Sequence, residues 1–247
     1  MKKRVLISGC SFTENFIQFD PMHWTYNAFP QDVYVVNNVA RGAAGNNYIA
    51  SSILSNIDLN SKPDYVFILW SGIRRIDMPF PSGTSTTKFK NYPFCAVNNE
   101  CQFVDYFFTG QNIAMLEGGS RRHFDVESSI FEELADIYYD NEVSDNFCNQ
   151  LSLSAISSVT NFLDNHNINY NFSFIYGIHN KHLGRQPSLG PIDTKNKQYD
   201  HINWDRYIDI PPFDYGIKHN LISADRFHLT DDGMRRWASL ITKEMNL

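Results

Sequence analysis

Short apolar runs of strand length alternate along this chain with segments in which apolar residues recur at helical spacing. The apolar runs lie at residues 5–8, 33–37, 65–70 and 170–176. Such runs are typical of strands buried in a parallel sheet that is covered by helices. The alternation therefore predicts an α/β fold.

Four segments have helical spacing. Their apolar residues are Ile49, Ile53 and Ile57; Ile130, Leu134 and Tyr138; Leu151, Ala155, Val159 and Phe162; and Met234, Trp237, Ala238, Ile241 and Met245. The last segment is the clearest, and Thr230 or Asp231 is in position to cap its N-terminus. We expect each segment to be a helix whose apolar stripe faces the sheet.

Two stretches interrupt the alternation. Residues 77–124 and, to a lesser degree, 177–221 are rich in proline and aromatic residues. A connection as long as the first is rarely structureless. We therefore predict a hairpin or lid insertion at 77–124, within a single domain that spans residues 1–247.

Composition narrows the class of protein. The 247 residues are 43% hydrophobic, which excludes wholesale disorder, and a net charge of −6 argues against nucleic-acid binding. No apolar run reaches the roughly 18 residues of a membrane helix. The strongly apolar run near the N-terminus, residues 5–7, is too short for a signal peptide. The sequence predicts a cytoplasmic protein without a membrane span and leaves its oligomeric state open.

Metal binding is not indicated by the cysteines or histidines. The cysteines are Cys10, Cys95, Cys101 and Cys148. They lack the paired spacing of a zinc site and are predicted to be reduced, although a bridge between Cys95 and Cys101 stays open in an oxidising compartment. The loop histidines between residues 179 and 201 have no further ligand at a recognisable spacing. We predict no metal and no cofactor.

The first motif that indicates chemistry is GCSFT at residues 9–13, directly after the first predicted strand. A serine on a tight strand-to-helix turn projects its hydroxyl beyond the carboxyl end of the strand, where open α/β sheets bind ligands. Gly9 allows the backbone to make such a turn. Ser11 is therefore a candidate nucleophile, with a plain helix N-cap as the alternative.

A second motif precedes the last predicted helix. Asp225 and His228 are three residues apart and can meet across one turn. A carboxylate beside an imidazole orients the ring and stabilises its protonated form, which leaves the other ring nitrogen to take a proton from Ser11. By itself the motif also fits a surface turn capped by Asp225. The two motifs together predict a Ser11–His228–Asp225 triad.

Together the two motifs resemble the SGNH (GDSL-like) hydrolase family. That family has a nucleophilic serine in a Gly-Asp-Ser-like block after strand one and an Asp-x-x-His block before the C-terminal helix. Cys10 replaces the usual aspartate, and we expect it to be a packing residue rather than a thiol nucleophile. The resemblance spans essentially the whole chain. It implies a three-layer α/β/α fold with a flavodoxin-like parallel sheet and an aromatic-rich insertion after strand three.

The resemblance also implies an oxyanion hole, the set of donors that receives the developing negative charge. The Ser11 N–H is the first donor. A glycine after strand two supplies another in the family, and both Gly42 and Gly45 fit that place. A dinucleotide phosphate loop is the alternative for these glycines, but the third glycine is missing and the loop follows the second strand rather than the first.

The third family block departs from its pattern. Family members have Gly-x-Asn-Asp after strand three, and the asparagine donates to the oxyanion, whereas residues 70–75 here read WSGIRR. The replacements that the sequence leaves open are Ser71, Asn46, Asn47 or backbone donors alone. Loss of one donor typically costs about 3 kcal/mol of transition-state stabilisation.

Three residues at the end of the third strand are candidates for substrate binding. Arg74 and Arg75 suit a carboxylate, a phosphate or a sugar acid, with a solvated loop charge or an ion pair to Asp77 as the alternative. Trp70 suits stacking on a sugar, with a buried strand-end aromatic as the alternative.

The function that these observations predict is that of a serine esterase. The family resemblance implies a small-molecule or glycan substrate with an O-acetyl or other short acyl ester, attacked by Ser11 with His228 as general base. An acyltransferase with the same triad is a second hypothesis, because the acceptor is chosen by water exclusion rather than by the triad. A binding module that has lost activity is a third, supported by the missing asparagine.

Overall fold

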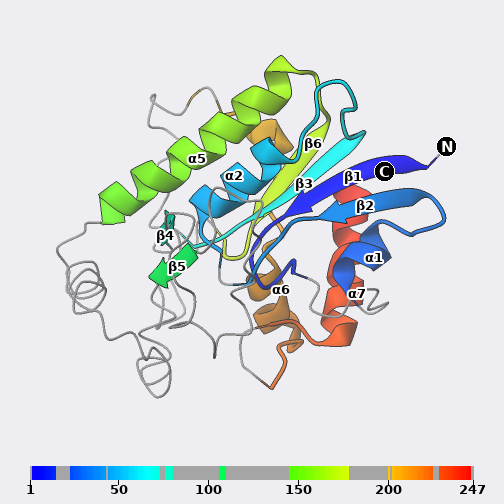
Figure 1. Ribbon diagram of the computed structural model, residues 1–247. Helices are drawn as coiled ribbons and strands as arrows, with labels where there is room; N and C mark the ends of the chain where they lie inside the picture. The colour runs from blue at the N-terminus through cyan, green and yellow to red at the C-terminus, as the bar shows by residue number, and fades with distance from the viewer. Residues whose placement is uncertain are drawn as a thin grey trace, which may run out of the picture.

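The centre of the fold is a four-stranded sheet in which all neighbouring strands are parallel (Figure 1). Its strands are β1 (Lys3–Ser8), β2 (Tyr34–Asn38), β3 (Tyr65–Trp70) and β6 (Tyr170–Phe174). Their order in space is β2-β1-β3-β6, as in a flavodoxin-like sheet. A parallel bridge between Phe172 and Tyr207 adds a short fifth position beside β6.

The computed structural model describes only part of the chain. The described residues are 2–14, 23–42, 44–72, 147–177, 200, 202–224 and 228–245, together with the backbone of 76–79, 106–109 and 145–146.

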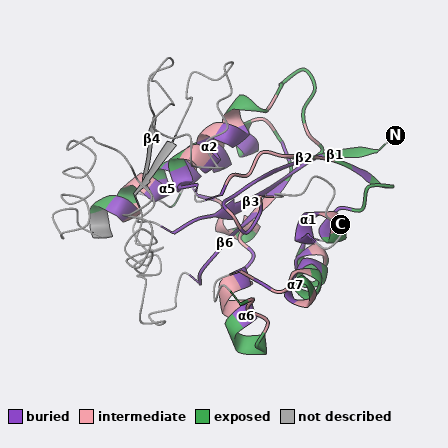
Figure 2. Ribbon diagram, turned by 60° about the horizontal axis from the view of Figure 1, so that its bottom comes forward, coloured by how far each residue is buried: buried purple, intermediate pink, exposed green. Residues whose placement is uncertain are grey.

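Helices cover both faces of the sheet, which makes the three layers predicted from the sequence (Figures 1 and 2). The helices are α1 (Trp24–Ala28), α2 (Asn46–Ser55), α5 (Asp145–Asn165), α6 (Pro212–His219) and α7 (Asp231–Glu244), with a short 3-10 helix, η3, at Trp204–Arg206. Helix α2 packs with α5 on one face, and α1 packs with α7 on the other. None of the helices in the described ranges combines the length and the apolarity needed to cross a membrane.

The core lies along β3, the strand with neighbours on both sides and helices above and below. All six of its residues are buried. On one face the Phe67 ring meets Trp24 of α1 at 5.4 Å between ring centroids. Trp24 in turn meets Trp237 of α7 at 4.9 Å, edge to face. This aromatic cluster fixes α1 and α7 against the sheet, because edge-to-face contacts restrict the orientation of each ring.

The elements differ in detail from the sequence predictions. Ile57 lies beyond the end of α2, which stops at Ser55 with Asn56 as its C-cap. In α5 the predicted Ala155 and Val159 are buried, whereas Leu151 and Phe162 are only half-buried. Ile156 and Leu163 are fully buried, so the buried stripe is partly shifted from the predicted one. Helices α1 and α6 were not predicted, since one is a single turn and the other begins at a proline.

Two short strands lie within the predicted insertion. Strands β4 (Ile76–Pro79) and β5 (Tyr106–Thr109) pair in antiparallel fashion. The rest of 77–124 and the predicted helix at 130–138 lie outside the described residues, so the lid interpretation stays a prediction.

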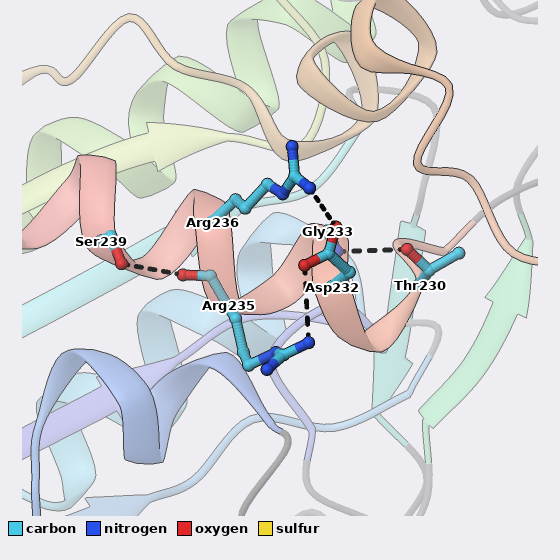
Figure 3. A network of polar contacts seen from close by, with 6 residues as sticks. All are labelled: Thr230, Asp232, Gly233, Arg235, Arg236 and Ser239. Atoms are coloured by element: carbon cyan, nitrogen blue, oxygen red, sulfur yellow. Dashed lines mark hydrogen bonds and ion pairs between the residues drawn. The ribbon is translucent and has the colours of Figure 1, made fainter.

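The N-cap of α7 provides a test of how the C-terminal helix is held. The Thr230 hydroxyl accepts a hydrogen bond from the Gly233 N–H at 3.1 Å, next to the ion pair of Asp232 with Arg236 at 2.7 Å (Figure 3). We expect Thr230→Ala to lower the free energy of unfolding by about 1 kcal/mol in urea titrations. Thr242→Ala is the matched control, because that hydroxyl only donates to Ala238 within the helix, and it should cost about 0.5 kcal/mol or less. Equal losses in the two variants would contradict a capping role.

Candidate active site

Three loops meet at the carboxyl edge of the sheet. Ser8 of β1 pairs with Ile68 of β3, and Ile7 pairs with Asn38 of β2, so the three strands end at nearly the same level. The loops that follow them begin with Gly9, Val39 and Ser71. Open α/β sheets bind ligands at this edge, which is where the sequence motifs place the site.

The loop after β1 is a single tight turn. The Cys10 carbonyl accepts hydrogen bonds from the N–H groups of Thr13 at 2.8 Å and Glu14 at 2.9 Å. Because the peptide bond is planar and trans, the Ser11 N–H points opposite to that carbonyl, away from the turn. Within the described part of the chain this N–H has no hydrogen-bond partner. It is therefore available as a donor to a ligand.

Gly9 starts this turn at a position where a Cβ atom would be too close to its neighbours. A Cβ atom at Gly9 would lie 2.4 Å from the Thr13 Oγ1 and 3.1 Å from the Leu69 carbonyl oxygen. The Gly9 carbonyl accepts from the Arg41 N–H at 3.1 Å, which joins the first loop to the second. Cys10 is fully buried, in agreement with the expected packing role.

His228 lies directly against the predicted nucleophile. Its Nε2 is 2.8 Å from the Ser11 Oγ, a distance at which the serine hydroxyl can donate to an unprotonated ring nitrogen. Both residues are half-buried. The Phe12 ring packs against the imidazole at 4.9 Å between centroids. The structure thus brings together two residues that are 217 positions apart in the sequence.

A short paired segment presents His228 to the serine. Ile222 and Leu229 form an antiparallel bridge, and the Ser223 N–H donates to the His228 carbonyl at 2.8 Å. The Thr230 N–H donates to Leu221 at 2.8 Å, just before α7 begins. Asp225, the predicted third member of the triad, lies outside the described residues, so its role stays a prediction.

The two candidate glycines of the second loop are both buried. The Gly42 N–H faces the carboxylate of Glu14, whereas Gly45 is the N-cap of α2. Helix α2 follows a strand of a parallel sheet, so its N-terminus lies at the carboxyl edge. The positive end of its dipole favours negative charge there.

Asn46 serves as a clamp between loops. It is 2% exposed; its Oδ1 accepts from the Ser71 N–H at 2.8 Å, and its Nδ2 donates to the Ser71 carbonyl at 3.2 Å and to the Ser152 Oγ at 3.0 Å. The amide is thus occupied within the fold, which favours a positioning role over the expected donation to an oxyanion. Asn47, the neighbouring candidate, is exposed.

Ser71 is the candidate donor that remains at the end of β3. Ser71 is fully buried, and its Oγ has no hydrogen-bond partner in the parts of the chain that the structure describes. A buried hydroxyl without a partner is uncommon, since leaving it unpaired costs free energy. A ligand that accepts a hydrogen bond would satisfy it.

The predicted substrate-binding residues are not supported equally. Trp70 is 0% exposed, so neither face of its ring is open to a sugar, and the buried alternative replaces the substrate-binding prediction. Its Nε1 is buried without a partner among the described residues. Arg74 and Arg75 lie outside the described residues.

The described residues contain no group of three or more His, Cys, Asp or Glu side chains placed to hold a metal ion. Cys10 and Cys148 are free thiols, both buried. The described residues do not include Cys95, Cys101 or the histidines between residues 179 and 201.

Glu14 is a site residue that the sequence analysis missed. Burial raises the pKa of its carboxyl above the ordinary value of 4.5. The Gly42 N–H and the Arg41 charge lower the pKa, but their effect is smaller than that of burial. Its Oε2 is buried without a hydrogen-bond partner within the described ranges. The only sequence signal was an acidic residue directly after the nucleophile motif. Its carboxylate faces one candidate oxyanion donor, so Glu14 links the nucleophile turn to the second loop.

Comparison with known proteins supports the fold. No protein-family model matches the sequence, and no curated protein sequence matches it. A member of the lipolytic protein G-D-S-L family from Veillonella parvula is similar in structure, with a TM-score of 0.51 and 10% identity over 98% of this chain and 97% of that one. An acetyl xylan esterase, AlAXEase, gives 0.49 and 14% identity over 98% and 97%, and the esterase EstA from Pseudoalteromonas sp. gives 0.48 and 12% over all of both chains. The similarity to the Veillonella parvula protein shows that the chain has the fold of SGNH hydrolases.

The close contact at Gly9 predicts that alanine is more destabilising at Gly9 than at Gly72, another glycine at the carboxyl edge. Gly9→Ala should lower the free energy of unfolding by about 1–3 kcal/mol, because the new methyl group must displace Thr13 or β3. Gly72→Ala is the control, since a Cβ there would lie 3.6 Å from the Tyr176 ring, an ordinary contact, and should change the value by less than about 1 kcal/mol. Urea titration measures both. A Gly9→Ala protein as stable as Gly72→Ala would contradict the packing described for the turn.

The raised pKa of Glu14 predicts a pH-dependent effect of Glu14→Gln. The folded protein holds the Glu14 proton to a higher pH than the unfolded chain does, so this group makes the free energy of unfolding fall as the pH rises from about 4.5 through the raised pKa. Glu14→Gln removes that loss. The unfolding free energy of the variant minus that of the wild type should therefore increase between pH 4 and pH 7 in urea titrations. A difference that stays constant or decreases over this range would contradict the assignment.

Proposed function

We propose that this protein is a serine hydrolase that cleaves a short acyl ester, with Ser11 as nucleophile and His228 as general base. The observation that carries the proposal is the 2.8 Å distance between the Ser11 Oγ and the His228 Nε2. A serine hydroxyl is a weak nucleophile until a neighbouring base accepts its proton. The pair lies at the edge of the sheet where open α/β folds bind ligands.

The proposed reaction proceeds in two steps. The Ser11 Oγ attacks the ester carbonyl while His228 takes the hydroxyl proton, and a tetrahedral intermediate forms. The bond to the alcohol then breaks, and His228 gives its proton to the leaving alkoxide, which leaves an acyl-serine. Water, deprotonated by His228, attacks the acyl group, and the acid and the free serine are released. We include Asp225 as the group that orients His228.

The oxyanion would be received by donors from the loops at the same edge. The Ser11 N–H is directed away from its own turn and has no partner in the described part of the chain. The Ser71 hydroxyl is a second donor, buried without a partner among the described residues. The N-terminus of α2 adds a favourable dipole. We propose that these groups replace the asparagine of the third family block.

The substrate class comes from the family resemblance. An O-acetyl or other short-chain ester, on a small molecule or a carbohydrate, is the substrate we propose. The proposed reaction uses side chains and backbone donors and requires neither a metal nor an organic cofactor.

Hydrolysis of p-nitrophenyl acetate tests the mechanism. We expect Ser11→Ala and His228→Ala to lower kcat/KM by at least about 10³-fold, because each removes a member of the nucleophile–base pair. Ser158→Ala and His219→Ala are matched controls on exposed positions of α5 and α6, and they should retain the wild-type rate. Equal rates in all five proteins would rule out this mechanism.

A further inference from the structure

Side chains from outside the nucleophile turn hold two of its carbonyl groups. The Trp24 Nε1 donates to the Phe12 carbonyl oxygen at 2.7 Å, and the Asn38 Nδ2 donates to the Thr13 carbonyl oxygen at 2.7 Å. Both distances are short for N–H···O hydrogen bonds. The turn that carries Ser11 is therefore fixed from α1 and from the end of β2, in addition to its own backbone hydrogen bonds.

Trp24 is a rigid donor. It is the first residue of α1, is 1% exposed, and has His23 as its N-cap neighbour. Its ring lies edge-on to Trp237 at 4.9 Å and to Phe67 at 5.4 Å, and these contacts restrict the orientation of the ring. The hydrogen bond to Phe12 is therefore set by the core itself, and not by a mobile side chain.

Phe12 contacts both reacting residues. Phe12 follows Ser11 directly, and its ring packs against the His228 imidazole at 4.9 Å. The carbonyl that Trp24 holds belongs to the peptide unit that joins Phe12 to Thr13. The N–H of the same unit donates to the Cys10 carbonyl at 2.8 Å and closes the turn around Ser11 and Phe12, so a rotation of this unit would open the turn. Holding its carbonyl thus constrains both partners of the 2.8 Å contact between Ser11 and His228.

We propose that Trp24 is a positioning residue for the nucleophile: through its hydrogen bond to the Phe12 carbonyl it holds Ser11 in line with His228. This inference rests on the proposed function of Ser11. Trp24 does not touch the reacting atoms, and it acts through the Phe12 peptide. Misplacement of a reacting group by about 1 Å can cost two orders of magnitude in rate, so loss of this hydrogen bond should reduce kcat.

Trp237 provides a matched control within the same aromatic cluster. It is also fully buried, and its Nε1 also donates to a backbone carbonyl at 2.7 Å, but that carbonyl belongs to Ile210, away from the nucleophile turn. Trp24→Phe and Trp237→Phe therefore remove the same kind of hydrogen bond and the same volume. Replacing either tryptophan by 3-benzothienylalanine removes only the N–H and covers the case in which a phenylalanine variant fails to fold.

The test measures p-nitrophenyl acetate hydrolysis together with the melting temperature. We expect 3-benzothienylalanine in place of Trp24 to lower kcat about ten-fold or more with KM within about two-fold. The same replacement of Trp237 keeps the ring that packs on Trp24 and should keep kcat within about two-fold. Both variants should lose melting temperature to a similar degree. Equal kcat values in the two variants would overturn the positioning role.

A second measurement separates this inference from the proposed function. The backbone amide resonance of Ser11 and the ring nitrogen resonances of His228, measured by NMR in labelled protein, report the geometry of the turn without any substrate. They should shift in the Trp24 variant and stay in place in the Trp237 variant. If the wild type hydrolyses no ester, the proposed function fails, yet this comparison still decides the role of Trp24. Unchanged resonances in the Trp24 variant would overturn it.

Discussion

The contact between Ser11 and His228 depends on two turns that lie at opposite ends of the chain. One turn leaves β1, the other precedes α7, and the two side chains meet at 2.8 Å. The first turn is fixed by the fit of Gly9 against β3 and by the Phe12 carbonyl that Trp24 holds. The second is fixed by the bridge between Ile222 and Leu229 and by the start of α7. Trp24 also packs edge to face on Trp237, a residue of α7, so α1 and α7 are joined by the same aromatic cluster.

The departure at the end of β3 has a physical explanation in Asn46. Where SGNH hydrolases place an asparagine after strand three, this chain has Ser71, and an asparagine from the second loop holds the backbone N–H and carbonyl of that serine. The same amide also reaches Ser152 of α5. Every polar group of the Asn46 side chain is thus paired, whereas the Ser71 hydroxyl stays unpaired in the described part of the chain. These contacts give Asn46 a positioning role at the end of β3.

Much of the fold could be predicted from the sequence, because strand and helix periodicity are local properties. The four strands of the sheet and the cap of α7, which the sequence placed at Thr230 or Asp231, followed from residues within a few positions of one another. The motifs that contain Ser11 and His228 are local in the same way. Contacts that join distant segments left no such signal. The hydrogen bond of Trp24 to Phe12 and the clamp of Asn46 on Ser71 depend on how whole elements pack. The two interpretations of Trp70 could not be separated from the sequence for the same reason, since a tryptophan at a strand end is exposed or buried according to what covers it.

The central claim is that Ser11 is a nucleophile activated by His228. Reaction of the wild-type protein with a fluorophosphonate, followed by mass spectrometry of the intact chain and of its peptides, tests this claim most directly. We expect one covalent adduct per chain, located on Ser11, and its absence when His228 is replaced by alanine. An unmodified Ser11, or equal modification with and without His228, would contradict it.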